Sequence, residues 1–303
     1  MKKVIENEEF LKAYLQDRQK IVEEALERYL PGEDNIPSDI YKAVRYSVFN
    51  GGKRIRPILC LAAADAVGGD LGVTIPVACA LELIHSYSLI HDDLPAMDDD
   101  DFRRGKPTCH KVFGEDIAIL AGDALLTEAF VLLSRTEKVR LSAEKRIAVI
   151  QEIAQASGID GMVGGQALDV LSEKFASDEK TLREIHRRKT GALIAAAVKS
   201  GAIISNAPKE KIQALAEYGI NVGLAFQIAD DILNVEGDRE LMGKETGSDA
   251  ARGKLTYPSL MGLGKAKEKL TKYIDAAEVS LSGFDERARP LILIARYVME
   301  RKS

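Results

Sequence analysis

Apolar residues along this chain recur with the period of an α-helix. The first segment is an example, with apolar side chains at Phe10, Ala13, Tyr14, Ile21, Ala25 and Leu26. This spacing places them on one face of a helix, and it continues through nearly every segment. No alternating run indicates a meander of strands. The pattern therefore predicts an all-α fold of about ten or more helices.

Segments rich in glycine, proline and small polar residues separate the helical windows. These breaks lie at residues 30–39, 67–72, 157–165, 205–208 and 236–258. Three windows follow a serine, a favoured N-cap, at Ser38, Ser142 and Ser177. No break resembles a flexible linker and no repeat of fixed period is visible, so we expect residues 1–303 to form a single domain. Long polar loops such as 236–258 are usually functional or mobile.

The composition limits the possible ligands and the compartment. The 303 residues are 46% hydrophobic and carry a formal net charge of -5. Nucleic acid is not expected as a partner, because an anionic ligand would have to be held by local cations or metal ions. Cys60, Cys79 and Cys109 form no CxxC pair and fit reduced core residues. No uninterrupted apolar run reaches membrane-spanning length, so we expect a cytoplasmic protein without a membrane anchor.

Acidic residues are concentrated in the stretch HDDLPAMDDDDFRRGKPTCH, residues 91–110. Asp92 ends a helical window in which His85 lies seven residues earlier, on the same face. Asp98 follows six residues later with Pro95 between, so the two carboxylates can converge on one ligand. Carboxylates at the C-terminal end of a helix repel one another and oppose the helix dipole unless cations such as Mg²⁺ neutralise them.

A second acidic cluster lies in AFQIADDILNVEGD, residues 225–238. One polar stripe of an otherwise apolar helix is formed by Gln227, Asp230, Asp231 and Asn234. Carboxylates among apolar neighbours should be paired or metal-bound, because an unmatched buried charge is costly. Either cluster alone could be a solvated acidic face, but two such clusters on separate apolar helices make that interpretation unattractive.

Basic residues accompany the acidic clusters and point to a diphosphate ligand. They are Lys53, Arg54 and Arg56 in GGKRIRP, Arg103, Arg104 and Lys106 after the first cluster, Lys189 beside Thr190 in HRRKTGAL, and Lys244 and Lys254 in the polar loop. Each alone would ordinarily be a surface charge. Together they fit a ligand whose oxygens are bridged to aspartate by Mg²⁺ and otherwise bound by arginine and lysine. Motifs of phosphate loops, dinucleotide folds, zinc proteases and serine hydrolases are absent from the sequence.

Seven ordered motifs between about residues 40 and 265 resemble the short-chain trans-prenyltransferases, specifically the bacterial farnesyl diphosphate synthases. They are GGKRIRP, HDDLPAMDDDDFRRGKPTCH, AGDALL, GGQALD, HRRKTGAL, FQIADDILNVEGD and GKLTYP. The resemblance implies a helical bundle of the isoprenoid synthase type around a central substrate cavity. It also implies a Mg²⁺-dependent homodimer, with Mn²⁺ as a substitute ion, that condenses isopentenyl diphosphate with allylic diphosphates.

The resemblance assigns roles to individual residues. The metal ligands would be Asp92, Asp98 and Asp230, with Asp93 and Asp231 beside them. The allylic diphosphate would contact Arg103, Lys189, Lys244 and Lys254, with Thr190 and Gln227 lining its site. Isopentenyl diphosphate would be held by Lys53, Arg56, His85 and Arg104. Charge withdrawal from the leaving diphosphate would involve the catalytic residues Asp92, Asp98, Asp230, Lys189 and Arg103. The released diphosphate would accept the proton, so no histidine base is required.

The length of the product is predicted separately, from Tyr87 and Ser88. Tyr87 lies five residues before Asp92, about 7.5 Å along the helix axis. A chain anchored at Asp92 would grow in this direction, so the Tyr87 ring would close the pocket floor unless it is only a packing residue. An aromatic side chain at this position resembles enzymes that stop at fifteen carbons, which favours farnesyl diphosphate as the product. In the second motif, Asn234 replaces the family's third aspartate, and we expect weaker metal affinity at that edge.

Other interpretations stay open. A geranyl or geranylgeranyl diphosphate synthase would use the same chemistry with another product length. A terpene cyclase would need no second diphosphate site, which leaves Lys53, Arg56 and Arg104 unexplained. A non-catalytic prenyl-diphosphate-binding subunit would have no reason to keep both acidic clusters.

Overall fold

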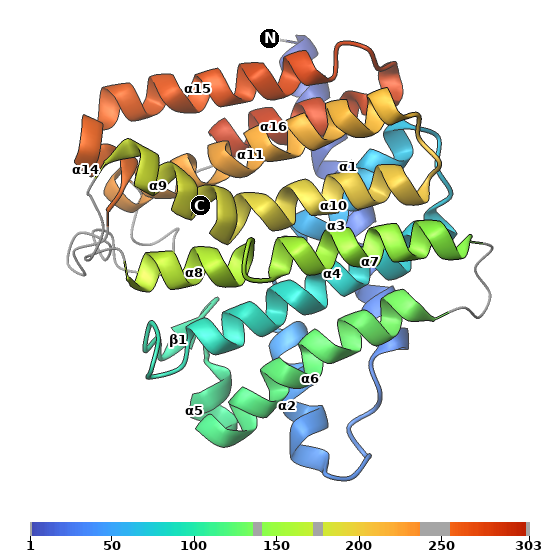
Figure 1. Ribbon diagram of the computed structural model, residues 1–303, viewed down its shortest axis with the longest axis vertical. Coiled ribbons are helices and arrows are strands. Elements are labelled where there is room, and N and C mark those ends of the chain that lie inside the picture. The colour runs from blue at the N-terminus through green and yellow to red at the C-terminus, as the bar shows by residue number, and fades with distance from the viewer. Residues whose placement is uncertain (1, 136–140, 172–177, 237–254, 301–303) are drawn as a thin grey trace.

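A computed structural model describes residues 2–135, 141–171, 178–236 and 255–300 of the chain. These residues are helical almost throughout, which confirms the predicted all-α class (Figure 1). The helices are α1 (Lys2–Tyr29), α2 (Ser38–Val48), α3 (Ile55–Ala66), α4 (Leu71–Asp92), α5 (Cys109–Phe113), α6 (Glu115–Ser134), α7 (Ala143–Ser157), α8 (Met162–Val170), α9 (Glu179–His186), η2 (Arg187–Gly191), α10 (Ala192–Ile204), α11 (Lys209–Glu236), α14 (Tyr257–Met261), α15 (Leu263–Ser280), η3 (Glu286–Ala288) and α16 (Arg289–Glu300).

One antiparallel hairpin interrupts the helices within the described residues. Its strands, β1 (Phe102–Arg103) and β2 (Lys106–Pro107), follow the first acidic cluster directly. The hydrophobic pattern did not predict this hairpin, because two-residue strands are too short to show an alternation. Its strands and turn carry the predicted arginines Arg103 and Arg104.

Helices α3 and α10 lie at the centre of the bundle. Both contribute side chains to the two buried clusters that form the hydrophobic core. The first cluster joins them to α4, α6 and α7, and the second joins them to α11, α15 and α16. Buried residues follow one another almost without interruption in both helices, as expected for helices enclosed on every side. The three cysteines are buried and unbridged, as predicted.

Helices α4 and α6 are long and apolar enough to cross a membrane by length and composition alone, with mean hydropathies of 1.5 and 1.8. Core helices of globular proteins pass the same test, and 67% of the apolar window of α4 is buried inside the protein. The corresponding share for α6 is 39%, because one of its faces is exposed. Two such helices are weak support for a membrane location.

The predicted N-caps have three different outcomes. Ser142 is confirmed, since its hydroxyl accepts a hydrogen bond from the Lys145 amide at the start of α7. The cap at Ser38 is wrong, because Pro37 already occupies the cap position and Ser38 is the first residue of α2. Ser177 lies outside the described residues, and the adjacent Asp178 caps α9 by accepting from the Thr181 amide at 2.8 Å.

Candidate active site

A cavity of about 920 Å³ is lined by residues of α4, the β1 hairpin, α8, η2 and α11. The volume lies within the range of ligand pockets, about 300–1,000 Å³. Most of the predicted site residues line it, namely Arg56, His85, Tyr87, Ser88, Asp92, Arg103, Arg104, Lys189, Thr190 and Asp230. Segments far apart in the sequence therefore meet at one cavity.

The two acidic positions of the first cluster are brought together by the backbone. Helix α4 ends at Asp92, and the chain then folds back so that the Asp98 amide donates to the Asp92 carbonyl at 2.8 Å. Burial raises the pKa of the Asp92 carboxyl to about 6, with the charge of Asp98 adding to the effect and Lys189 opposing it. The predicted convergence of Asp92 and Asp98 thus has a structural basis in this turn.

The second acidic cluster reaches the same cavity because α11 packs very closely against η2. A Cβ atom added at Gly223 would lie 2.6 Å from the Gly191 Cα, so a larger residue would force the two elements apart. On the other side of η2, a Cβ atom at Gly165 of α8 would lie 2.1 Å from the Lys189 amide nitrogen. These two contacts bring α8 and α11 against the π-helical turn that carries Lys189, and π-helical turns are frequent at functional sites.

Hydrogen bonds join the residues around this turn. Thr190 donates its hydroxyl to the Gln227 side-chain oxygen at 2.8 Å, and Lys189 donates to the Asp169 carboxylate at 2.6 Å. Burial alone would lower the pKa of Lys189, but Asp169, together with the charges of Asp92 and Asp98, holds that pKa above its ordinary value. Lys189 is therefore a charged donor at the cavity wall.

The second aspartate of each acidic pair does not line the cavity and contacts another element instead. Asp93 is buried and accepts a hydrogen bond from Arg103 Nε at 2.8 Å. It therefore orients Arg103, which we expect to bind the allylic diphosphate. Asp231 is buried in α11 and accepts from the Tyr257 amide at 2.9 Å, at the start of α14. Direct metal ligation by Asp93 and Asp231 stays a prediction, while these contacts give both residues a positioning role.

Further basic residues line the same cavity. Arg56 and Arg104 line the cavity together with His85. Burial lowers the pKa of Arg56 to about 10, which still leaves it charged at neutral pH. Burial and the neighbouring arginines lower the pKa of His85 well below its ordinary value, so this imidazole is neutral. The cavity thus contains cations separate from Lys189 and Arg103.

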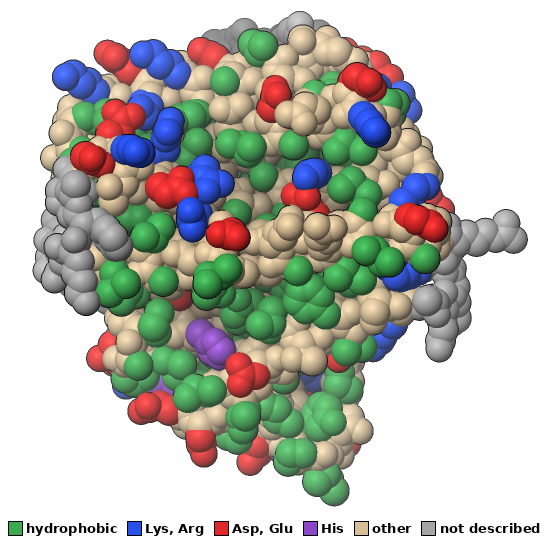
Figure 2. Space-filling view, viewed as in Figure 1, with side chains coloured by type: hydrophobic (Ala, Val, Ile, Leu, Met, Phe, Trp, Pro, Cys, Tyr) green, Lys and Arg blue, Asp and Glu red, His purple; other side chains and the backbone are tan. Residues whose placement is uncertain are grey.

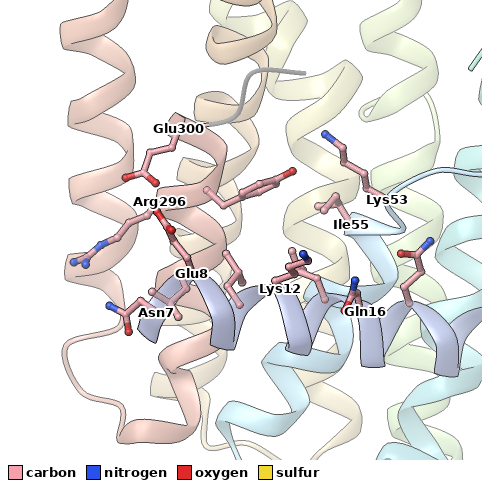
Figure 3. A pocket seen from close by; sticks show the side chains of 13 residues that line it. Asn7, Glu8, Lys12, Gln16, Lys53, Ile55, Arg296 and Glu300 are labelled. Carbon is pink, nitrogen blue, oxygen red and sulfur yellow. The ribbon is translucent and has the colours of Figure 1, made fainter. Parts of the chain in front are cut away.

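Lys53 is placed differently from the other predicted ligands of isopentenyl diphosphate. It lines a second cavity of about 580 Å³ between α1 and α16, and its ammonium lies 5.8 Å from the centre of the Tyr297 ring (Figure 3). The expected contact between Lys53 and isopentenyl diphosphate therefore stays a prediction. Lys244 and Lys254 lie outside the described residues, and Asn234 is half-buried on α11 beyond the cavity lining.

The cavity residues fit a hard divalent cation. Asp92 and Asp230 offer carboxylate oxygens from two helices, and Asp98 is held beside Asp92 by the backbone turn. Oxygen donors of this kind are the ligands that Mg²⁺ prefers. Burial disfavours the ionised form of the Asp92 carboxyl, and a divalent ion would favour that form.

Sequence reasoning missed the wall formed by α8. Met162, Gln166 and Val170 line the cavity, and Asp169 pairs with Lys189. The motif GGQALD was recognised, but its residues received no role because nothing in a nine-residue helix reveals its neighbours. The motif itself was the available signal.

Comparisons with known proteins agree with this geometry. The family model described as polyprenyl synthetase matches residues 37–282. A farnesyl diphosphate synthase of Geobacillus stearothermophilus is 47% identical over 288 residues, covering 95% of this chain and 97% of the relative. A geranylgeranyl diphosphate synthase of Cyanophora paradoxa is 45% identical, with 97% of each chain covered. The crystal structure of geranylgeranyl pyrophosphate synthetase from Pyrococcus horikoshii superposes with a TM-score of 0.88 at 34% identity, covering 97% of this chain and 99% of that one. This chain therefore belongs to the polyprenyl synthetase family.

Proposed function

We propose that this chain is a trans-prenyltransferase that condenses isopentenyl diphosphate with dimethylallyl and then geranyl diphosphate, giving farnesyl diphosphate. The observation that carries the proposal is the number of anion-binding groups that line one cavity. We divide them into a first set, Asp92 and Asp230 with Lys189 and Arg103, and a second set, Arg56 and Arg104. A single diphosphate held by Mg²⁺ and the cations of the first set would leave the second set without a role.

The first set would hold the allylic diphosphate and assist its departure. Mg²⁺ held by Asp92, Asp98 and Asp230 would neutralise charge on this leaving group. Arg103 and Lys189 would donate hydrogen bonds to its oxygens and stabilise the negative charge that develops there. Asp93 and Asp169 orient these two cations in advance, so little reorganisation is needed during the reaction.

The second set would hold isopentenyl diphosphate with its double bond towards the allylic carbon. When the allylic carbon–oxygen bond breaks, the double bond attacks the carbocation and a new carbon–carbon bond forms. The proton lost from the product would pass to the released diphosphate. Neutral His85 would donate a hydrogen bond to the second diphosphate without adding charge.

The apolar part of the cavity would hold the growing chain. Tyr87 and Ser88 line it from α4, and Met162, Val170 and Phe226 line it from α8 and α11. We propose Tyr87 as the floor that limits the product to fifteen carbons. The alternative product is geranylgeranyl or geranyl diphosphate, since a relative named geranylgeranyl diphosphate synthase is 45% identical to this chain.

We further propose a cytoplasmic homodimer in which residues 1–303 form one domain. The single domain is supported by α3 and α10, which contribute to both core clusters. The dimer is supported by the hydrophobic side chains gathered over α6 and α8 in Figure 2. The exposed hydrophobic residues of these two helices include Leu120 and Val170. Light scattering of the purified protein should give twice the chain mass of 33.1 kDa, and a monomeric mass would contradict this part.

The proposed reaction can be tested with the purified chain alone. Radiolabelled isopentenyl diphosphate is incubated with each allylic diphosphate, with and without Mg²⁺, and the dephosphorylated products are separated by length. A Mg²⁺-dependent fifteen-carbon product is expected. A longer product would preserve the chemistry and reject Tyr87 as the floor. Absence of condensation would favour a non-catalytic binding subunit, and a cyclised product from the allylic substrate alone would favour a cyclase.

A further inference from the structure

The turn before α3 has an unusual backbone. Gly51, Gly52 and Arg54 all have positive φ angles, of 81°, 121° and 52°. Glycine adopts such angles without strain, but arginine does so only where its surroundings hold it there. Arg54 is also 3% exposed, which is rare for an arginine unless it is paired. Its side chain therefore has a structural reason to be buried at this position.

The Arg54 guanidinium is fixed by contacts at two of its nitrogens. Nη1 donates to the Glu82 carboxylate at 2.7 Å, and Nη2 donates to the Val48 carbonyl at 2.7 Å. Glu82 is 2% exposed and lies on α4, three residues before His85 and ten before Asp92. The ion pair thus ties the turn to the helix that carries the acidic end of the site.

The same turn supports both arginines of the second anion-binding set. The Arg104 guanidinium donates to the Gly51 carbonyl and lies against Gly52, where an added Cβ atom would be 2.5 Å from Arg104 Nη1. Arg56 follows Arg54 by two residues and lines the cavity from the first turn of α3. A displacement of the turn would therefore move Arg56 and Arg104 together.

The negative charge of Glu82 also stabilises the charged forms of Arg56 and Arg104. Burial lowers the pKa values of Arg56 and Arg104, and Glu82 opposes that effect at both. One Glu82 oxygen and the Arg56 Nε are buried without a hydrogen-bond partner among the described residues. Glu82 thus pairs with Arg54 directly and acts on Arg56 and Arg104 through its charge.

We propose that Arg54 and Glu82 form a positioning pair that holds Arg56 and Arg104 in place for the diphosphate of isopentenyl diphosphate. Neither member lines the cavity, so the pair acts through the turn at residues 51–54 and through its charge. The proposal rests on the proposed function, because it assigns this part of the cavity to the second substrate.

The test separates the two substrates kinetically. Glu82→Gln should raise the KM for isopentenyl diphosphate by about tenfold or more, because small displacements of binding groups have large effects. The KM for geranyl diphosphate should change by less than about threefold, since that site depends on other residues. Arg54→Lys should have the same selective effect, because lysine keeps the charge but cannot contact Glu82 and Val48 together. Glu82→Asp, which keeps the charge, should recover part of the affinity.

A matched control separates positioning from general loss of stability. Arg18 and Asp65 form another partly buried ion pair, at 2.9 Å, which joins α1 to α3 without a hydrogen bond to the turn. Asp65→Asn should lower the melting temperature but leave the KM for isopentenyl diphosphate unchanged. An equal rise in that KM would show that any loosening of α3 has the effect, and it would overturn the proposal.

Remaining outcomes also decide the question. An unchanged KM for isopentenyl diphosphate in folded Glu82→Gln protein overturns the proposal. If that variant does not fold, the double variant Arg54→Met/Glu82→Met replaces both buried charges by apolar groups and must show the same selective rise. If the wild-type chain catalyses no condensation, the proposed function fails separately. Calorimetric binding of isopentenyl diphosphate to the wild type and the Arg54→Lys variant then tests the pair, and equal affinities would refute it.

Discussion

Replacement of Tyr87 by alanine should lengthen the product. Tyr87 is 6% exposed, lines the cavity and packs edge-on against His91 with ring centres 5.8 Å apart. Without the ring, the cavity would extend by about one helical turn, 5.4 Å, along α4. Leu83, fully buried one turn further along α4, would then become the next barrier. We therefore expect one additional five-carbon unit and a twenty-carbon main product.

The substitution also has a cost in stability that can be compared with the product change. Removal of a buried aromatic side chain lowers the free energy of unfolding by about 3–5 kcal/mol. The lower end applies here, because Tyr87 borders an existing cavity and few of its neighbours would face a new void. Urea unfolding of the variant should show this loss while leaving the protein folded at the assay temperature.

The assay is the separation of dephosphorylated products by chain length after incubation with radiolabelled isopentenyl diphosphate. Tyr87→Phe is the matched control, since it keeps the ring and should keep the fifteen-carbon product. A folded Tyr87→Ala protein that still stops at fifteen carbons would refute the reasoning and place the floor elsewhere in the cavity.

Three further changes test other contacts. Asp93→Asn should lower kcat/KM for the allylic substrate by about tenfold, because Arg103 loses its nearest charged partner and keeps only the more distant Asp100, at 3.8 Å. Steady-state kinetics with an unchanged value would contradict this role. Asn234→Asp should lower the Mg²⁺ concentration needed for half-maximal activity by a few-fold, since it adds a negative charge one helical turn after Asp230. Equal Mg²⁺ titrations of the two proteins would contradict this expectation. Gly223→Ala should lower both melting temperature and activity, because its Cβ would lie 2.6 Å from a backbone atom of η2. Gly264→Ala is the control for that change, with nothing within 4 Å of the added Cβ, and similar melting temperatures for the two variants would argue against the close packing.

The sequence predicted those features of the site that depend on local spacing. Helical periodicity placed Gln227 and Asp230 on one stripe, and the spacing of Asp92 and Asp98 indicated their convergence. Such relations follow from the geometry of one helix and its end. The ordered motifs then indicated which helices would share a cavity, which composition and periodicity alone could not do.

Relations between distant segments could not be predicted in this way. Arg54 was read only as one cation of GGKRIRP, although it pairs with Glu82, 28 residues further along the chain. Asp231 was grouped with Asp230, but adjacent residues on a helix point in different directions, and Asp231 contacts the start of α14. The Lys53 side chain lies between α1 and α16 because the turn geometry, rather than its neighbours in sequence, sets its direction.

Helix α4 carries Glu82, His85, Tyr87 and Asp92 within a single rigid segment. Substitutions can therefore change substrate affinity, product length or metal binding one at a time. A one-residue insertion between Tyr87 and Asp92 would instead rotate every earlier side chain by about 100° relative to the acidic end. Related enzymes that differ in product length should thus vary in side-chain size along this helix and conserve its length.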